Sequence, residues 1–237
     1  MYLLVTGFYA FLSHLDYLYA AVAAYLCGCF NGALFTSRLF FHDDVRTHGS
    51  GNAGLTNFYR TYGARYALLV IACDMLKAVA AVSLAAWLGA RFDPRMLPDL
   101  PLTAAEQAEY VLHFKYLAGF FCVVGHMFPC TAKFRGGKGI LCSATLTLLL
   151  DWRIAAVGWG LFLLLWLTTR YVSLGSVTGA FSFPVTTLLF FRGNWTVFAL
   201  SLAIAALVIW AHRSNIDRLL HGTESRFQWH TNGPGRS

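Results

Sequence analysis

The stretch ARYALLVIACDMLKAVAAVSLAAWLGA, residues 64–90, decides the class of fold. It is apolar over nearly its whole length, and only Arg65, Asp74 and Lys77 interrupt it with formal charges. A bilayer core about 30 Å thick is crossed by roughly 20 helical residues. The run therefore predicts a transmembrane helix.

The composition of the whole chain agrees with a membrane protein. Of its 237 residues, 57% are hydrophobic and 12% are charged, against about 45–50% and about 25% in soluble domains. The first dozen residues have neither a basic region nor a small-residue cleavage site, so we expect no cleavable signal peptide. The sequence predicts an all-α, polytopic integral membrane protein.

Seven apolar runs, separated by short polar segments, predict about seven transmembrane helices. They are residues 16–40, 64–90, 107–125, 139–150, 153–169, 174–191 and 195–211. The fourth run is short, so it is either a half-helix or begins inside the preceding loop. The apolar residues 1–11 are too few to span a bilayer, and we expect an interfacial or extending segment there. We assign one integral domain, residues 1–237.

Lysine and arginine residues near the helix ends predict the orientation, because cytoplasmic loops carry an excess of them. Seven spans place twelve of these residues on one face: Arg38, Arg46, Arg60, Arg65, Lys133, Arg135, Lys138, Arg170, Arg213, Arg218, Arg226 and Arg236. The opposite face receives four: Arg91, Arg95, Arg153 and Arg192. Lys77 and Lys115 fall within the predicted spans. We therefore expect the N-terminus outside and the C-terminus in the cytoplasm.

A glycine-rich loop on the predicted cytoplasmic face, GSGNAG at residues 49–54, contains a literal G-x-G-x-x-G. No strand-rich unit surrounds it, which disfavours a dinucleotide-binding turn. Glycines still let backbone N–H groups approach an anion, and a following helix adds positive potential. The alternative is a loop that only turns the chain between two helices.

A second glycine cluster, RGGKG at residues 135–139, precedes the fourth run. It is not a Walker A loop, because Ala132 replaces its first glycine and Gly139 replaces its Ser or Thr. Two glycines and a lysine at a helix N-terminus are nevertheless typical of a site for one phosphate. Anchoring by positive charge on the cytoplasmic side explains the charge alone, without the glycines.

Two further polar segments lie at the same predicted depth. One is TRYVSLGSV at residues 169–177, whose serines by themselves are explained by helix capping. The other is AHRSNIDRLLHGTE at residues 211–224, which follows the last apolar run. Four donor-rich segments thus converge on one face of an apolar chain.

These segments resemble the motifs of a known family, the bacterial acyl-phosphate:glycerol-3-phosphate acyltransferases, called PlsY. The resemblance covers about residues 20–226. Its motifs are similar to residues 49–57 with Arg60 and Gly63, residues 125–139, residues 170–176, residues 212–224, and an Asp-x-x-Lys pattern at Asp74 and Lys77. The chain departs from the family in GCFNGA at residues 28–33, in Leu55 and in Gly175.

The resemblance implies transfer of a fatty acyl group from acyl phosphate to the primary hydroxyl of glycerol 3-phosphate, giving lysophosphatidic acid and phosphate, the first acylation of phospholipid synthesis. An acyl phosphate carries a good leaving group, so the reaction needs aligned substrates and stabilised charge. We expect no cofactor, no metal ion and no covalent nucleophile. We also expect a bacterial inner-membrane location, with the active site facing the cytoplasm and the acceptor and donor bound beside membrane lipid. The working expectation for the oligomeric state is a monomer, and nucleic-acid binding has no support.

The resemblance also implies roles for individual residues. Catalytic roles fall on Lys138, Arg60, Ser50 and Ser176. Substrate-binding roles fall on Gly136, Gly137, Asn52, Thr56, Asn57, His212 and Asn215. The two glycines and Lys138 would cradle the donor phosphate, and Lys138 would bridge both substrates. In the family a substrate phosphate is thought to assist deprotonation of the attacking hydroxyl, so no dedicated base is assigned.

Other titratable residues have a plain structural reading beside a functional one. His212 and Asp217 have the H-x-x-x-x-D spacing of an acyltransferase dyad, but the rest of that fold is missing. His126 is either a loop-fixing residue or a supporting residue of the site. Asp74 and Lys77 can face each other at i and i+3, and we favour a structural pair. The six cysteines lack paired C-x-x-C spacing, so apolar packing is the default.

Two rival functions remain at the level of sequence. A carrier for an organic phosphate would need polar residues at mid-membrane and clusters on both faces, whereas these clusters lie on one face. An acyltransferase using acyl-CoA or acyl carrier protein would need a larger cytoplasmic docking surface.

Overall fold

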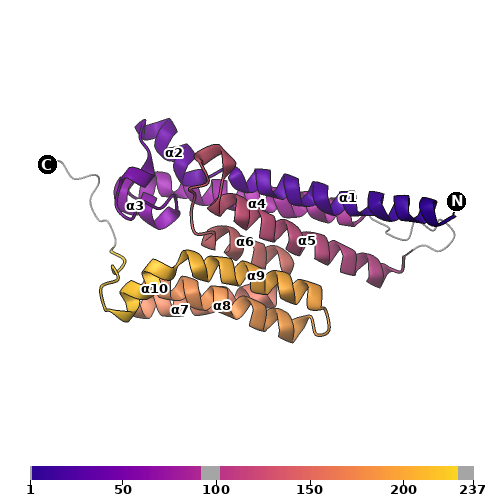
Figure 1. Ribbon diagram of the computed structural model, residues 1–237. Helices are drawn as coiled ribbons and strands as arrows, with labels where there is room; N and C mark the ends of the chain where they lie inside the picture. The colour runs from indigo at the N-terminus through magenta and orange to yellow at the C-terminus, as the bar shows by residue number, and fades with distance from the viewer. Residues whose placement is uncertain (1, 92–101, 229–237) are drawn as a thin grey trace.

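The computed structural model describes the backbone of residues 2–91 and 102–228, and the side chains of residues 15–91 and 102–228. The described residues contain helices and no strand, which confirms the all-α prediction (Figure 1). The elements are α1 (Tyr2–Cys29), α2 (Gly32–Phe41), η1 (Val45–Thr47), α3 (Leu55–Tyr62), α4 (Ala64–Gly89), α5 (Ala104–Met127), η2 (Cys130–Ala132), α6 (Ile140–Leu150), α7 (Trp152–Thr169), α8 (Val172–Phe190), α9 (Trp195–Ala211) and α10 (Arg213–Leu220).

Five helical stretches in the described part of the chain are long and apolar enough to cross a membrane. A sixth is added if α9 and α10, which meet at a bend of 59°, form one span. The predicted fourth span is α6, which is shorter than these. The number of seven spans and the orientation therefore stay predictions. Residues 2–11 extend the first helix, because α1 is continuous from Tyr2.

The first predicted helix is broken, which the apolar run 16–40 did not indicate. α1 ends at Cys29 and α2 begins at Gly32. Asn31 has an extended backbone, and its side chain accepts a hydrogen bond from Leu34 N–H, so it caps α2. This cap starts a new helix in the middle of an apolar run.

Small residues bring α1 and α5 close together. A Cβ added at Gly28 would collide with the backbone carbonyl of Cys122, and one added at Gly125 would collide with that of Tyr25. Buried alanines line the same contact and its extension to α4. Close approach through small residues is the usual basis of helix packing in membranes. A second, bulkier core joins α5, α6, α8 and α9.

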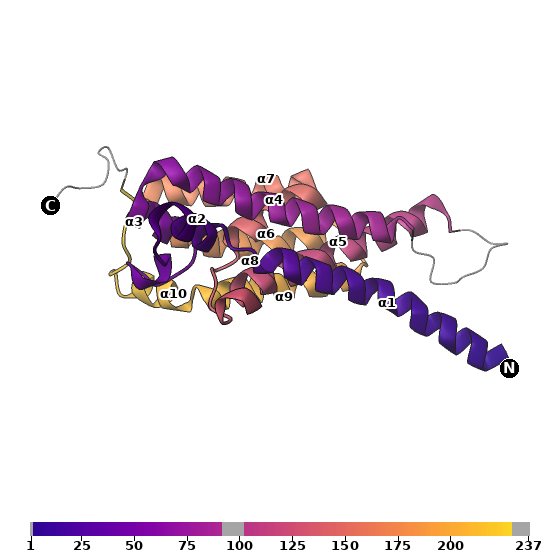
Figure 2. The same ribbon diagram turned by 90° about the horizontal axis from the view of Figure 1, so that it is seen from above.

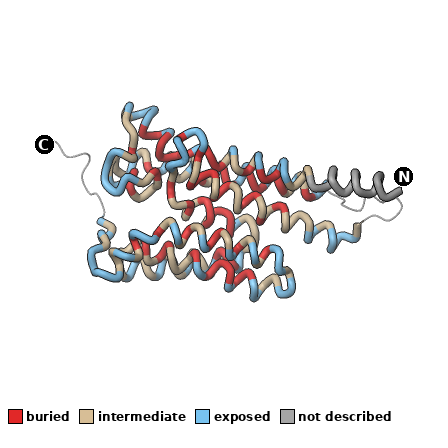
Figure 3. The backbone as a smooth tube through the Cα atoms, viewed as in Figure 1, coloured by how far each residue is buried: buried red, intermediate tan, exposed pale blue. Residues whose placement is uncertain are grey.

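The buried residues lie inside this bundle, and exposed residues cover its outside (Figure 3). Many of the exposed side chains are large and apolar, including Leu68, Leu164 and Phe181, each more than half exposed. Contact of such an apolar surface with water is unfavourable, whereas contact with lipid acyl chains is favourable.

The four polar segments are brought to one end of the bundle. There α2, α3 and α10 lie away from the N-terminus of α1, together with the α5–α6 and α7–α8 connections (Figures 1 and 2). The α8–α9 turn lies at the opposite end of the bundle (Figure 1). The expected convergence on one face is thus present.

Candidate functional site

The first loop, residues 48–54, is held in shape by Asn57. Its side-chain amide donates to the carbonyls of Val45, His48 and Asn52 at 3.0–3.1 Å, and its carbonyl accepts Ser50 N–H at 3.0 Å. Gly49 and Gly51 have positive φ, 53° and 69°, which side chains tolerate poorly. The predicted shaping role of Asn57 therefore has a clear geometry.

The remaining predicted residues of this segment lie around the loop and the start of α3. Ser50 is exposed, and Asn52 and Thr56 are half-buried. No hydrogen bond from the side chains of these three residues is formed within the described part of the chain. Their donors are therefore available to a ligand.

The second loop, residues 128–139, lies directly on the end of α5. Gly136 N–H donates to Met127 carbonyl at 3.0 Å, and Gly137 N–H donates to His126 carbonyl at 3.1 Å. A Cβ at Gly136 would collide with the His126 carbonyl, and one at Gly137 with the His126 ring. The glycines thus permit close packing, and their own N–H groups are already bonded. A phosphate cradle here would use Lys138 and the backbone that follows it.

Arg46 joins the two loops. Its guanidinium donates to the carbonyls of Ala132 and Arg135, at 2.9 and 3.0 Å, and also to Asp44. Asn31, at the break between α1 and α2, holds the first loop by donating to the Ala53 carbonyl at 2.9 Å. The linking role of Arg46 had no signal in the sequence, where this residue entered only the count of basic residues.

Lys138 lies where the polar segments meet. Gly139 follows it with φ 77° and is the N-cap residue of α6, so the lysine side chain leaves the loop at a helix start. Its ammonium donates to the side-chain oxygen of Asn215 on α10. Burial lowers the pKa of Lys138 to about 8, Glu224 opposes this, and Arg218 and Arg60 reinforce it. The group therefore remains largely protonated at neutral pH.

Glu224 is the centre of a buried hydrogen-bond cluster. No role was assigned to it from the sequence. One carboxylate oxygen accepts from Ser173 at 2.8 Å and Asn215 at 2.7 Å, and the other from Arg218 at 2.7 Å. Burial raises the pKa of Glu224, but these three donors together hold it below its usual value. Its only signal in the sequence was its place in the GTE stretch.

The C-terminal segment 221–228 crosses from α3 to the α7–α8 turn. Arg60 donates to the Ser225 carbonyl at 3.3 Å, and Phe227 N–H donates to the Arg170 carbonyl at 2.7 Å. The Phe227 ring stacks on Tyr59 with centroids 5.2 Å apart. Arg60 is thereby tied to the segment that also carries Glu224.

Ser176 and His212 are both buried below these loops. Ser176 Oγ donates to the Val172 carbonyl within α8 at 2.9 Å. His212 Nδ1 bonds the Val208 carbonyl at 2.8 Å, which leaves Nε2 as its second polar atom. Asp217 is instead exposed and pairs with His221 at 3.4 Å. The structure therefore does not bring His212 and Asp217 together as a dyad.

The site carries an excess of positive charge. Asp43 is bonded to His48 and Tyr62, and Asp44 is paired with Arg38 and Arg46. Within the described residues no carboxylate forms an ion pair with Lys138 or Arg60. Two cations without carboxylate partners, next to free hydroxyl and amide donors, suit a phosphorylated ligand.

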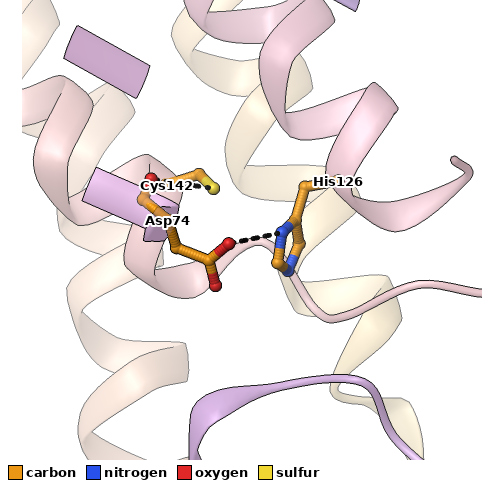
Figure 4. Close-up of side chains that lie close together, drawn as sticks. All are labelled: Asp74, His126 and Cys142. Atoms are coloured by element: carbon orange, nitrogen blue, oxygen red, sulfur yellow. Dashed lines mark hydrogen bonds and ion pairs between the residues drawn. The ribbon is translucent and has the colours of Figure 1, made fainter. Parts of the chain in front are cut away.

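One buried cluster has residue types typical of metal ligands: Asp74, His126 and Cys142, whose ligand atoms lie within 4.8 Å of one another (Figure 4). Lys77 Nζ lies 2.8 Å from Asp74 Oδ1 and 2.7 Å from His126 Nδ1. The ammonium thus occupies the place that a metal ion would take. This cluster does not fit a metal site.

Gly175, which departed from the expected pattern, has a local explanation. A Cβ at this position would lie 2.7 Å from the Phe162 carbonyl, so glycine permits the close contact of α7 and α8.

The chain is similar to known proteins over most of its length. Residues 18–222 match the family model described as glycerol-3-phosphate acyltransferase. The glycerol-3-phosphate acyltransferase of Thermoanaerobacter sp. (strain X514) is 37% identical over 206 residues, 87% of this chain and 93% of that protein. That of Fusobacterium nucleatum is 33% identical over 208 residues, 88% and 96% of the two chains.

Two solved structures are similar over most of the chain. Both are crystal structures of PlsY (YgiH), an integral membrane glycerol 3-phosphate acyltransferase. The glycerol 3-phosphate form superposes with a TM-score of 0.73 at 29% identity, covering 90% of this chain and 96% of that one. The lysophosphatidic acid form gives a TM-score of 0.72 at 28% identity, covering 90% and 95%.

Proposed function

The chain belongs to the glycerol-3-phosphate acyltransferase family, so it is an integral membrane enzyme that acylates glycerol 3-phosphate to lysophosphatidic acid, and we propose that its acyl donor is a fatty acyl phosphate. The observation that carries the donor proposal is the position of Lys138. Its ammonium lies between the glycine loop and the Asn215–Glu224 cluster, where it can meet two phosphates at once.

The reaction needs no covalent enzyme intermediate. The primary hydroxyl oxygen of glycerol 3-phosphate attacks the carbonyl carbon of the acyl phosphate. The new ester bond forms as the bond between that carbon and the phosphate oxygen breaks, and the hydroxyl proton ends on the released phosphate. Charge develops on the leaving phosphate, so a fixed ammonium close to it lowers the barrier.

Lys138 and the start of α6 would hold the donor phosphate, with Gly136 and Gly137 setting the path of the loop. Arg60, Ser50, Ser176, His212 and Asn215 would position the acceptor, and Asn52, Thr56 and Asn57 would shape the loop above it. Arg60 and Lys138 approach from different elements, α3 and the α6 N-terminus. This separation supports two phosphate positions, one for each substrate.

The site would face the cytoplasm of a bacterial inner membrane. The sequence assigns twelve lysines and arginines to the face of the polar segments and four to the other, which supports this orientation. A single domain over residues 1–237 and a monomer complete the proposal.

The donor is tested by release of inorganic phosphate from palmitoyl phosphate by the purified protein, with and without glycerol 3-phosphate. Palmitoyl-CoA serves as a parallel donor. Release that depends on the acceptor, without transfer from the thioester, is the expected result. Transfer from the thioester alone would overturn the donor proposal, and no transfer from either would favour a phosphate carrier.

A further inference from the structure

A buried polar chain outside the substrate-binding residues runs from α4 to the second loop. Asp74 and Lys77, both on α4, form an ion pair at 2.8 Å, with side chains only 2% and 4% exposed. A buried ion pair adds little stability by itself, because desolvation offsets the attraction. Its other partners therefore decide what it does.

The pair satisfies the break between α1 and α2. Lys77 Nζ donates to the Phe30 carbonyl at 2.6 Å and to the Gly28 carbonyl at 3.3 Å. Asp74 Oδ1 accepts Gly32 N–H at 3.2 Å. A helix break leaves such groups without partners, which is costly where water is absent. Part of the role of Lys77 and Asp74 is thus structural.

The remaining partner of Lys77 is His126, at the end of α5 on which the second loop lies. Lys77 Nζ donates to His126 Nδ1 at 2.7 Å, and Asp74 Oδ1 lies 3.7 Å from the same nitrogen. An ammonium group has only donors, so Nδ1 accepts, and the neutral ring carries its proton on Nε2. Figure 4 shows the ring with Nδ1 turned to Asp74. The pair therefore fixes both the orientation and the tautomer of His126.

The second loop is built on His126. Gly137 N–H donates to the His126 carbonyl, and Gly137 packs so closely on the ring that a Cβ there would collide with Nε2. Lys138 is the next residue. A rotation of the ring would displace the backbone from which Lys138 reaches the site.

We propose that His126 is a positioning residue for the acyl donor, held by Lys77 and Asp74 so that its ring supports the loop that carries Lys138. This inference rests on the proposed binding of the donor by that loop. It adds a task to the Asp74–Lys77 pair, which the sequence alone favoured as a structural pair.

The first test compares His126→Ala with His126→Asn, because asparagine can still offer an acceptor to Lys77. Steady-state kinetics are measured for both substrates, with the donor being whichever one the wild-type enzyme uses. In His126→Ala the KM for the donor should rise roughly tenfold, because the loop is misplaced. The KM for glycerol 3-phosphate should stay within about twofold, and His126→Asn should recover part of the loss.

Lys115→Met is the matched control, because Lys115 also lies in a membrane helix and donates to a backbone carbonyl, that of Leu149. It should leave both KM values unchanged. Equal rises in both KM values in His126→Ala, or a fall only in the amount of folded protein, would show a merely structural role and overturn the inference.

A double-variant cycle tests the link to Lys77. If Lys77 acts on the donor through His126, Lys77→Met added to His126→Ala should raise the donor KM no further than His126→Ala alone. Independent, multiplicative effects would contradict the link. If Lys77→Met does not fold, the two His126 variants still decide the inference.

The outcome is separable from the fate of the donor proposal. Wild-type transfer from the thioester alone would refute acyl phosphate as the donor. The KM for the thioester would then be measured in the His126 variants. A selective rise of that KM in His126→Ala would support the positioning role, and an unchanged KM would refute it.

Discussion

Lys138 is placed by contacts with three parts of the molecule: the end of α5, the start of α6, and α10. It follows two glycines packed on α5, precedes the left-handed Gly139, and contacts Asn215 from α10. The sequence could single out this lysine, because a glycine-rich segment before an apolar run is a local signal. It could not show that the N–H groups of Gly136 and Gly137 are bonded to α5, because that bonding depends on tertiary packing.

Removal of the Lys138 ammonium should abolish most turnover. In Lys138→Ala we expect kcat/KM to fall about 10²- to 10³-fold, the usual effect of losing a group that stabilises developing charge. Lys133→Ala is the control, because Lys133 is an exposed lysine of the same loop. Phosphate release is the measurement. Near-normal turnover in Lys138→Ala would refute the proposed role.

The pH dependence of the reaction should report the same group. With a pKa of about 8, Lys138 loses its charge as the pH rises through that value, so kcat/KM should fall above about pH 8. A bound phosphate dianion favours the ammonium, so the fall in kcat should occur at higher pH. Rates are corrected for spontaneous hydrolysis of the donor, and Lys138→Arg, which stays charged, should lack this fall.

The effect of Lys138 on stability has the opposite sign. Its folded pKa of about 8 is below the ordinary 10.5, so the unfolded chain binds more protons between these values. The contribution of this lysine to stability therefore rises with pH across that window, while activity declines.

A wild-type rate that is constant through pH 9, after correction for hydrolysis, would argue against an essential Lys138 ammonium.

Glu224 should be important for the fold of the site. Glu224→Gln removes the charge that pairs with Arg218 and leaves at least one buried donor poorly matched, which costs about 1–3 kcal/mol. We expect a lower thermal unfolding temperature in detergent. Asp217→Asn is the control, because Asp217 is also acidic but its side chain is 72% exposed. Equal unfolding temperatures for the two variants would show that the cluster is dispensable.

At the scale of elements, hydrophobic runs predicted most helices but not their breaks. The break at residues 30–31 depends on the Asn31 cap and on partners supplied by Asp74 and Lys77, more than forty positions later in the sequence. The short α6 was predicted as a half-helix or as a run beginning in the loop, and Gly139 now marks its start. Apolar periodicity reports what faces lipid or core, and it says little about which polar groups interrupt a span.

The α1–α5 contact makes a prediction at this scale. In Gly28→Ala the new methyl group would meet the Cys122 carbonyl, a backbone group that cannot move cheaply, so we expect a loss of about 1–3 kcal/mol. Gly160→Ala, in the exposed face of α7 with open space around it, should stabilise its helix slightly. Thermal unfolding of both variants in one detergent measures the difference. A stable Gly28→Ala protein would mean that α1 and α5 are less tightly packed.

At the scale of the molecule, the sequence indicated that four polar segments share one face, and the structure brings them to one end of the bundle (Figure 1). Charge asymmetry was sufficient for that inference because loops alternate between the two faces. It was insufficient for the contacts across the site, such as Arg46 to the second loop or Arg60 to Ser225, because these join segments far apart in sequence.

The orientation of the whole molecule is still a prediction, and one cysteine allows a direct test. Cys130 is exposed at the beginning of the second loop, whereas the other five cysteines are buried or half-buried. If the site faces the cytoplasm, a membrane-impermeant maleimide should label Cys130 only after the cells are permeabilised. Cys130→Ser protein should remain unlabelled in both conditions, which identifies the reacting thiol.

A cysteine on the opposite face completes the argument. Arg192 is exposed in the α8–α9 turn, so Arg192→Cys in a Cys130→Ser background should be labelled in intact cells. The two proteins should thus give reciprocal patterns, because a loop on each side of the membrane is sampled in turn. Labelling of Cys130 in intact cells would place Lys138 and Arg60 outside the cell. It would then separate the site from any donor made in the cytoplasm, and the acyl-phosphate proposal would lose its supply.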